Sequence, residues 1–124
     1  QPLHAICLHL ALNEKGRRKQ LQQVSSHIRD LVPDKAPLIL AGDFNDWRQR
    51  APDYLAHELG LIEVFESIQG YPALSFPAAL PLFALDRIYT RGFQVASARV
   101  LHGSSWRRLS DHAALTAHLL PLPV

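Results

Sequence analysis

Apolar and polar stretches alternate along the chain in a way that predicts strands and helices of one α/β unit. The first apolar run covers residues 5–10 and contains one polar side chain, His9, and a second run covers residues 38–41 and stops at Gly42. Runs of this length are typical of buried strands. Between them Asn13 can cap a helix, and Pro33 ends an apolar stripe with spacings of three and four residues, formed by Leu21, Val24, Ile28 and Leu31. Strand, helix and strand in this order favour a crossover unit with parallel or mixed pairing.

The second part of the chain predicts more strands separated by irregular segments. Pro52 and Gly60 delimit a short helix, and residues 61–64 predict a brief strand. Residues 69–82 are rich in proline and aromatic residues, which indicates an ordered loop rather than a linker. Further strands are expected over residues 85–90, 94–101 and 113–119, and the last of these alternates as an extended segment does when one face is more deeply buried.

Length and composition indicate one domain-sized unit. The 124 residues are 48% hydrophobic, enough to bury a core, so we expect residues 1–124 to form a single unit. The net charge of +2 and the pI near 9.0 are compatible with a phosphorylated substrate but do not demonstrate nucleic-acid binding. No apolar run is long enough to cross a bilayer.

The single cysteine, Cys7, excludes an internal disulfide framework and a cysteine-rich zinc site. Because it lies in an apolar run, we expect a buried and inert thiol. This cysteine usage favours a reducing compartment, the cytoplasm.

Six polar side chains interrupt or end the apolar runs, and they are the candidates for a site. Two of them, Asp43 and Asn45, lie two residues apart on an extended segment and would therefore project in the same direction. A buried polar group without a partner is costly, so convergence on one shared site with a divalent cation or a phosphate satisfies all six most simply. The six are His9, Asp43, Asn45, Asp86, Asp111 and His112. The remaining histidines are interpreted as ordinary core or surface residues.

Three motifs carry a resemblance to a known family. Gly-Asp-Phe-Asn at residues 42–45, Leu-Asp-Arg-Ile-Tyr at 85–89 and Ser-Asp-His at 110–112 follow the His9 strand in this order, and Ser-Phe-Pro at 75–77 precedes the second motif. In this arrangement the chain resembles the endonuclease/exonuclease/phosphatase (DNase I-like) superfamily over nearly its whole length. The resemblance implies an α/β fold that is half of a four-layered α/β sandwich, with one mixed β-sheet and helices on one face. It also implies metal-dependent hydrolysis of a phosphoester.

The resemblance also implies roles for individual residues. Asp43 would position or activate the attacking water and contribute to the metal site, Asn45 would hold the scissile phosphate or support the metal site, and Asp111 would be a metal ligand. Phosphate esters are anionic, so such a site needs cationic charge at the non-bridging oxygens. Oxygen-rich ligands select Mg²⁺, or Mn²⁺ as a substitute.

The remaining implied roles concern the two imidazoles and the residues beside the motifs. Asp86 would accept a hydrogen bond from His112 and favour its protonated form, which would stabilise charge on the phosphate, and His9 would support the phosphate or leaving group. Aromatic and basic residues beside the motifs are candidates for substrate binding, with an ordinary solvated loop as the alternative. They are Trp47, Arg48, Arg87, Trp106, Arg107 and Arg108.

One departure from the family pattern has consequences. The resemblance implies an asparagine and a metal-binding glutamate on strands that precede the His9 region, and the sequence contains neither segment. We therefore expect the chain to be the C-terminal half of the domain, with the N-terminal half absent. As an isolated fragment it should be inactive and should associate with a second copy or with the missing half.

The substrate class stays open at this stage. Nucleic acid, a phosphorylated lipid and a phosphorylated small molecule all fit a phosphodiesterase or phosphatase of this chemistry, because family members change substrate through loops. The alternative of another class is a noncatalytic binding module that keeps the fold and binds a partner through the two tryptophans and the arginines.

Overall fold

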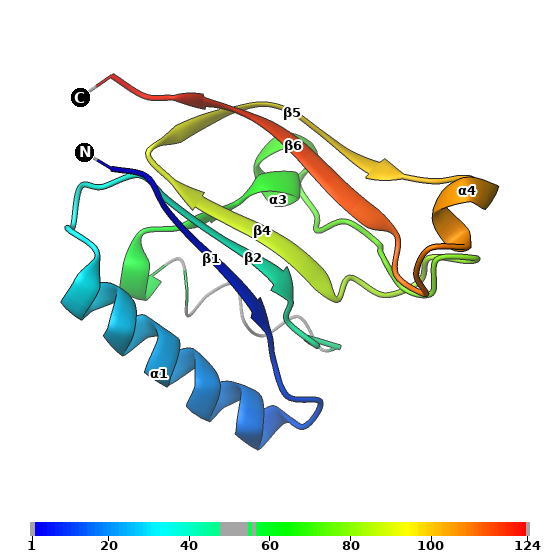
Figure 1. Ribbon diagram of the computed structural model, residues 1–124, viewed down its shortest axis with the longest axis horizontal. Helices are drawn as coiled ribbons and strands as arrows, with labels where there is room; N and C mark the ends of the chain where they lie inside the picture. Colours follow the sequence, from blue (N-terminus) through cyan, green and yellow to red (C-terminus); the bar gives the residue numbers. More distant parts are fainter. Residues whose placement is uncertain (1, 48–54, 56, 124) are drawn as a thin grey trace.

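The computed structural model of the chain describes residues 2–47, 55 and 57–123 (Figure 1). Its strands and helices follow one another in the order β1 (His4–His9), α1 (Glu14–Leu31), β2 (Leu38–Asp43), β3 (Ile62–Glu63), α3 (Val64–Gln69), β4 (Asp86–Arg91), β5 (Phe93–Leu101), α4 (Ser104–Arg107) and β6 (Ala114–Pro121). Within this part of the chain, no helix is both long and apolar enough to cross a membrane.

A mixed four-stranded sheet with the order β1-β2-β4-β3 forms the centre of the fold. β1 and β2 run parallel, as the strand, helix, strand order predicts, and β4 runs antiparallel to both β2 and β3. Helix α1 connects β1 to β2 and lies along one face of these strands (Figure 1). The mixed α/β architecture predicted from the sequence is therefore confirmed.

Helix α1 begins and ends where the sequence predicts. The Asn13 side chain accepts a hydrogen bond from the Gly16 backbone amide at 2.7 Å, which caps the first turn. The helix buries Leu21 and Ile28 against Leu38 and Leu40 of β2 in the main core. The expected apolar stripe is shorter than predicted, because its last member, Leu31, is 71% exposed at the end of the helix.

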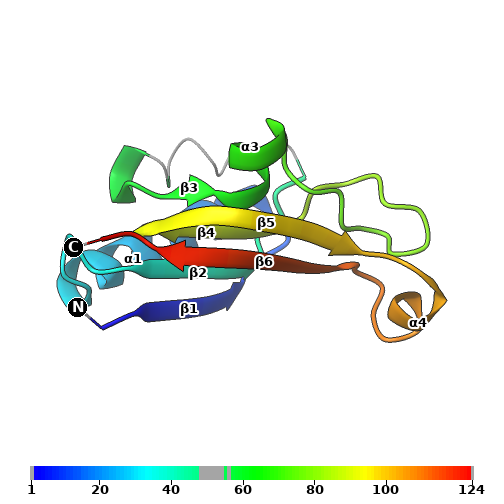
Figure 2. The ribbon, with the colours of Figure 1, turned by 90° about the horizontal axis from the view of Figure 1, so that it is seen from above.

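Strands β5 and β6 form a separate two-stranded antiparallel sheet, so the expectation of a single sheet is wrong in this respect. Strand β4 pairs with β2 along its whole length and with β3 only at Tyr89 and Thr90, and β5 does not join this sheet. Instead the chain turns at Gly92, where φ is +87°, and the β5-β6 hairpin packs on a second core around Val64, Phe65 and Ile88 (Figure 2). Helix α3 belongs to this second core, so the helices do not all cover one face.

The two short helices α3 and α4 were not predicted. Glu63 supplies the N-cap of α3, since its buried carboxylate accepts hydrogen bonds from the backbone amides of Phe65 and Glu66 at 3.0 Å each. The same carboxylate accepts the Ile88 amide at 3.1 Å and thereby joins α3 to β4. Burial raises the pKa of Glu63, although these backbone hydrogen bonds oppose the shift. Of the helix expected between residues 52 and 60, residues 55 and 57–59 are helical, and the remainder lies outside the described residues.

The face of β1 that points away from α1 is open. Ala5, Cys7 and His9 alternate with the half-buried Ile6 and Leu8 and are exposed. The expectation of a buried Cys7 thiol is therefore wrong, because the apolar run is covered on only one side.

Gly42 allows β1 and β2 to approach each other. Its φ is +144°, and a Cβ at this position would lie 1.9 Å from the backbone oxygen of Leu8 on β1. We expect Gly42→Ala to separate the two strands and to lower the free energy of unfolding by about 3 kcal/mol or more. Urea unfolding of the complete protein measures this change.

Gly70 provides the matched control, because its φ is +86° but no described atom lies within 4 Å of a Cβ built there. Gly70→Ala should cost only about 1 kcal/mol, from backbone strain alone. Equal losses for the two variants would show that the contact with Leu8 is unimportant.

Candidate active site

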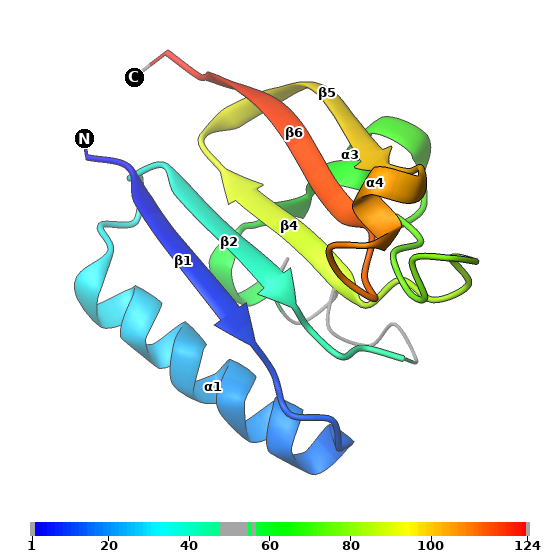
Figure 3. The ribbon, with the colours of Figure 1, turned by 45° about the vertical axis from the view of Figure 1, so that its right-hand side comes forward.

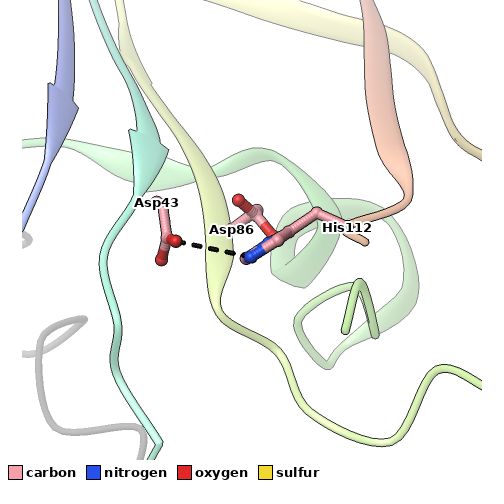
Figure 4. A group of neighbouring side chains, drawn as sticks. All are labelled: Asp43, Asp86 and His112. Carbon is pink, nitrogen blue, oxygen red and sulfur yellow. Dashed lines mark hydrogen bonds and ion pairs between the residues drawn. The ribbon is translucent and has the colours of Figure 1, made fainter. Parts of the chain in front are cut away.

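The candidate active site forms where β2 ends and β4 begins. Asp43, the last residue of β2, is paired in register with Asp86, the first residue of β4. The loop before β6 brings His112 to the same place (Figure 4). One ligand atom from each of these three side chains lies within 4.8 Å of the others.

His112 lies between the two carboxylates. Its Nδ1 is 2.7 Å from Oδ2 of Asp86, and its Nε2 is 3.6 Å from Oδ2 of Asp43. The imidazole ring also packs against Phe76, with ring centroids 4.9 Å apart. With Asp86 ionised, Nδ1–H donates to that carboxylate, which fixes the ring and directs Nε2 toward Asp43.

Electrostatics favour the charged form of this histidine. Partial burial alone would lower the pKa of His112. The hydrogen bond to Asp86 and the negative charges of Asp86, Asp43 and Asp111 outweigh that effect, so the pKa of His112 is raised above its ordinary value. The site therefore holds an imidazolium over a wider pH range than a solvent-exposed histidine would.

Ser75 holds the carboxylate of Asp86 in place. It was not predicted as a site residue from the sequence. Its hydroxyl donates to Oδ2 of Asp86 at 2.5 Å and accepts the Asp86 backbone amide at 3.2 Å, and the residue is fully buried. The Ala113 amide donates to the Ser75 carbonyl at 2.7 Å, which ties the segment to the start of β6. The only sequence signal for this role was the Ser-Phe-Pro segment ahead of β4.

The loop after β2 is held by Asn45 in an uncommon backbone conformation. Its φ is +47°, its backbone amide donates to Oδ1 of Asp43 at 2.8 Å, and its side-chain Nδ2 donates to the Leu10 carbonyl at 2.7 Å. These bonds attach the loop to the end of β1 and orient the Asp43 carboxylate. On the neighbouring strand, Nε2 of His9 lies 3.5 Å from Oδ2 of Asp43, although the His9 side chain is 76% exposed.

The structure thus brings together five of the six polar residues singled out in the sequence, namely His9, Asp43, Asn45, Asp86 and His112. Asp111 lies exposed beside them, and its charge contributes to the raised pKa of His112. It is not a member of the group with metal-binding spacing. Its backbone carbonyl accepts the Ala78 amide at 2.7 Å, which fixes the chain in front of His112.

Arg87 is buried and does not lie on the surface beside the site, so the expectation that it binds substrate is wrong. β4 turns Asp86 toward the site and Arg87 toward the opposite, α1-facing core, where its side chain is fully buried. There Nη2 lies 3.7 Å from Oδ2 of Asp46, and Nη1 donates to the Ala84 carbonyl. Asp46 was not predicted from the sequence as the partner of Arg87. A buried arginine requires an acidic partner, and Asp46 follows Asn45 directly.

The other residues expected to bind substrate differ in their surroundings. Trp47 is 39% exposed and packs against Phe83 and Phe76, with ring centroids 4.8 and 5.8 Å apart. Trp106 is 40% exposed on α4, and Arg107 and Arg108 are exposed beside it. Arg48 lies outside the described residues.

The donor atoms fit a divalent cation. Mg²⁺ commonly binds through one or two carboxylates and completes its shell with water and substrate phosphate oxygens, and Asp43 and Asp86 offer such carboxylates. Imidazole nitrogen is a ligand better suited to softer metals. Because Nδ1 of His112 is engaged with Asp86, the carboxylate oxygens are the groups that could hold the ion.

The Asp86 to His112 contact leads to a prediction for the metal-free protein. Asp86→Asn should lower the pKa of His112, because it removes both a charged hydrogen-bond acceptor and a negative charge. NMR titration of the imidazole in the presence of EDTA measures the pKa. Asp111→Asn is the control and should lower it less, because Asp111 contributes only its charge. A His112 titration unchanged by Asp86→Asn would contradict the assigned contact.

The same contact fixes how stability depends on pH. Because the folded-state pKa of His112 is raised, its stabilising effect is fully present below the unfolded-state pKa and is lost as the pH rises through the folded-state pKa. Asp86→Asn should therefore destabilise the fold more at acidic pH than at alkaline pH.

Comparison with known proteins identifies the family of the chain. Residues 3–112 match the model of the Endonuclease/Exonuclease/phosphatase family. The uncharacterized protein YbhP of Escherichia coli is 43% identical over 117 residues, which cover 94% of this chain and 46% of YbhP. The chain therefore spans about half the length of this curated relative.

Two solved structures share the fold. The mannosyl-6-phosphatase Bt3783 of Bacteroides thetaiotaomicron superposes with a TM-score of 0.76 at 24% identity, over 94% of this chain and 50% of that one. TDP2 of D. rerio, complexed with a single strand DNA product, superposes with a TM-score of 0.68 at 21% identity, over 94% of this chain and 55% of that one. The chain belongs to the endonuclease/exonuclease/phosphatase family.

Proposed function

We propose that the chain carries the catalytic acid–base half of a metal-dependent phosphoesterase. The observation that supports this most directly is the imidazole of His112, placed between Asp86 at 2.7 Å and Asp43 at 3.6 Å. A structural histidine does not need two carboxylates at the ends of two adjacent strands. A site that must stabilise negative charge on a phosphate and position a water does need them.

In the proposed reaction each residue has one task. Asp43 orients the attacking water and accepts its proton, since its Oδ1 is fixed by the Asn45 amide. His112, kept protonated by Asp86, donates a hydrogen bond through Nε2 to a phosphate oxygen in the transition state. Asn45 and His9 contact the phosphate or leaving group from the β1 side, and the leaving oxygen takes up a proton from solvent when its bond to phosphorus breaks. When bound, Mg²⁺ or Mn²⁺ would neutralise charge on the non-bridging oxygens.

Asp111 is proposed as a further metal ligand in the complete site. It is exposed and adjacent to His112 in the chain, and its negative charge contributes to the raised pKa of His112. The complete site also needs a carboxylate from outside the chain, in keeping with the family pattern. We therefore propose that residues 1–124 alone turn over little or no substrate.

The substrate class is proposed in general terms. A phosphodiester or phosphomonoester fits the site, on nucleic acid, a phosphorylated lipid or a small molecule. Trp47, Trp106 and Arg107 are the proposed contacts to the remainder of the substrate, because they are partly or fully exposed and lie close in sequence to site residues. A noncatalytic binding module is the alternative, and the position of Asp111 outside the metal-binding group is the observation that favours it.

The open face of the sheet supports a proposal about association. Ala5 and Cys7 of β1 are exposed, and Ile39 and Ala41 of β2 are only half-buried. This face carries small and apolar side chains and needs a cover. We propose that the remaining part of the domain covers it, and that a second copy covers it when the chain is isolated.

Activity is tested with the complete protein. We expect hydrolysis of bis(p-nitrophenyl) phosphate or p-nitrophenyl phosphate in Mg²⁺ or Mn²⁺, abolished by EDTA, and a loss of about 10²–10⁴-fold in kcat for His112→Ala. Asp43→Asn should lose at least as much. The matched control is His118→Ala, at an exposed histidine on β6, which should retain full activity. Wild-type rates for His112→Ala would exclude the proposed role.

Association is tested with residues 1–124. Multi-angle light scattering should give a mass at least twice that of the chain, and Cys7→Arg, which places a charge on the open face, should shift the population toward monomer. The control is Leu31→Arg at the exposed end of α1, which should leave the mass unchanged. A monomer at high concentration would contradict the proposal.

A further inference from the structure

Two segments beside the site carry large apolar side chains in solvent. The first is the loop before β4, where Leu80 is 65% and Leu82 is 58% exposed. The second is α4 with the residue that follows its last turn, where Trp106 is 40% and Leu109 is 76% exposed. We call these four residues the apolar rim.

Backbone hydrogen bonds within the loop before β4 hold the segment that carries Leu80 and Leu82. The amides of Leu82 and Phe83 donate to the Phe76 carbonyl at 3.0 and 2.9 Å, and the Leu80 amide donates to the Pro77 carbonyl at 3.1 Å. At the base of the loop, Phe76 and Phe83 pack against Trp47. The exposure of Leu80 and Leu82 is therefore fixed by hydrogen bonds and packing.

The two segments lie at the same end of the molecule and are joined through the backbone. The Ala78 amide donates to the Asp111 carbonyl at 2.7 Å, which joins the loop to the chain that follows α4. Figures 1 and 3 show the loop and α4 at the same end of the molecule, opposite the two termini, and Figure 2 shows the loop on the α3 side and α4 on the β1 side of the β5-β6 hairpin. At the base of the loop, Phe76 packs against His112 with ring centroids 4.9 Å apart, which connects the loop that carries Leu80 and Leu82 to the site.

The composition of this surface favours one kind of partner. Arg107 and Arg108 are exposed between Trp106 and Leu109, so positive charge lies within the apolar rim. Three of the four residues of the apolar rim are leucines, and aliphatic side chains, unlike Trp106, cannot stack on bases as single-stranded nucleic acids require. Leucine is also under-represented among the residues that dominate protein interfaces. Leucine and tryptophan inserted among acyl chains, with arginines at the phosphate level, match an anionic membrane surface.

We propose that the apolar rim, with Arg107 and Arg108, docks the protein on the surface of an anionic phospholipid bilayer and presents the site to that surface. The inference goes beyond the proposed function, because docking requires neither metal nor turnover. Insertion of Leu80, Leu82 and Leu109 supplies the apolar part of the binding, and the two arginines supply the preference for negatively charged lipid.

The test is vesicle sedimentation of the complete protein in buffer with EDTA, so that a failure of hydrolysis cannot affect the result. Wild type should pellet with vesicles of phosphatidylcholine mixed with phosphatidylglycerol, and much less with phosphatidylcholine alone. The variant Leu80→Ser/Leu82→Ser/Leu109→Ser should bind the mixed vesicles at least about tenfold more weakly. Arg107→Gln/Arg108→Gln should remove most of the preference for anionic lipid.

Two controls separate docking from loss of fold. All substituted side chains are exposed, so thermal unfolding midpoints should stay near the wild-type value. Leu31→Ser replaces a leucine that is 71% exposed at the end of α1, far from the apolar rim, and should bind vesicles as wild type does.

Three outcomes would overturn the proposal. The first is wild-type protein that remains in the supernatant with both kinds of vesicle. The second is equal vesicle binding by wild type and the triple leucine variant. The third is a single-stranded oligonucleotide that binds wild type and is lost in the triple variant while vesicles do not bind, which would assign the surface to nucleic acid.

Discussion

The close approach of β1 to β2 at Gly42 is the constraint on which the rest of the molecule depends. The Leu8 carbonyl occupies the space of a side chain at residue 42, so the two parallel strands come together there and end side by side. That contact places His9 next to Asp43 and lets the following turn reach back to Leu10 through Asn45. The hydrophobic core and the candidate active site therefore both depend on this short piece of backbone.

The site also depends on a series of polar side chains, each of which contacts the next. Ser75 holds Asp86, Asp86 holds His112, and His112 faces Asp43, so each carboxylate has a defined partner. Buried or half-buried carboxylates without such partners would lose their charge or destabilise the fold. The arrangement therefore explains how polar residues that interrupt apolar strands can be tolerated, and why they lie where three segments meet.

Much of the fold and of the site follows from the sequence, and the exceptions have physical reasons. The pattern of apolar residues located β1 and β2 as apolar runs of strand length, β4 as a further strand, and α1 as an apolar stripe with helical spacing. It did not locate α3, which is six residues long and depends on a cap by Glu63, or the separation of the β5-β6 hairpin, which follows the turn at Gly92 and packs on the second core around Val64 and Phe65. Arg87 was misplaced because strand alternation shows that it opposes Asp86 without showing which face is buried.

The alternation of Asp86 and Arg87 means that the Leu-Asp-Arg-Ile-Tyr motif records two independent requirements. Arg87 pairs with Asp46 inside the core and serves folding, while Asp86 supports the imidazole and serves the site. A relative that keeps the arginine but replaces the aspartate has retained the scaffold and given up the support of its histidine. The motif is therefore informative about catalysis only when Ser75 and His112 accompany it.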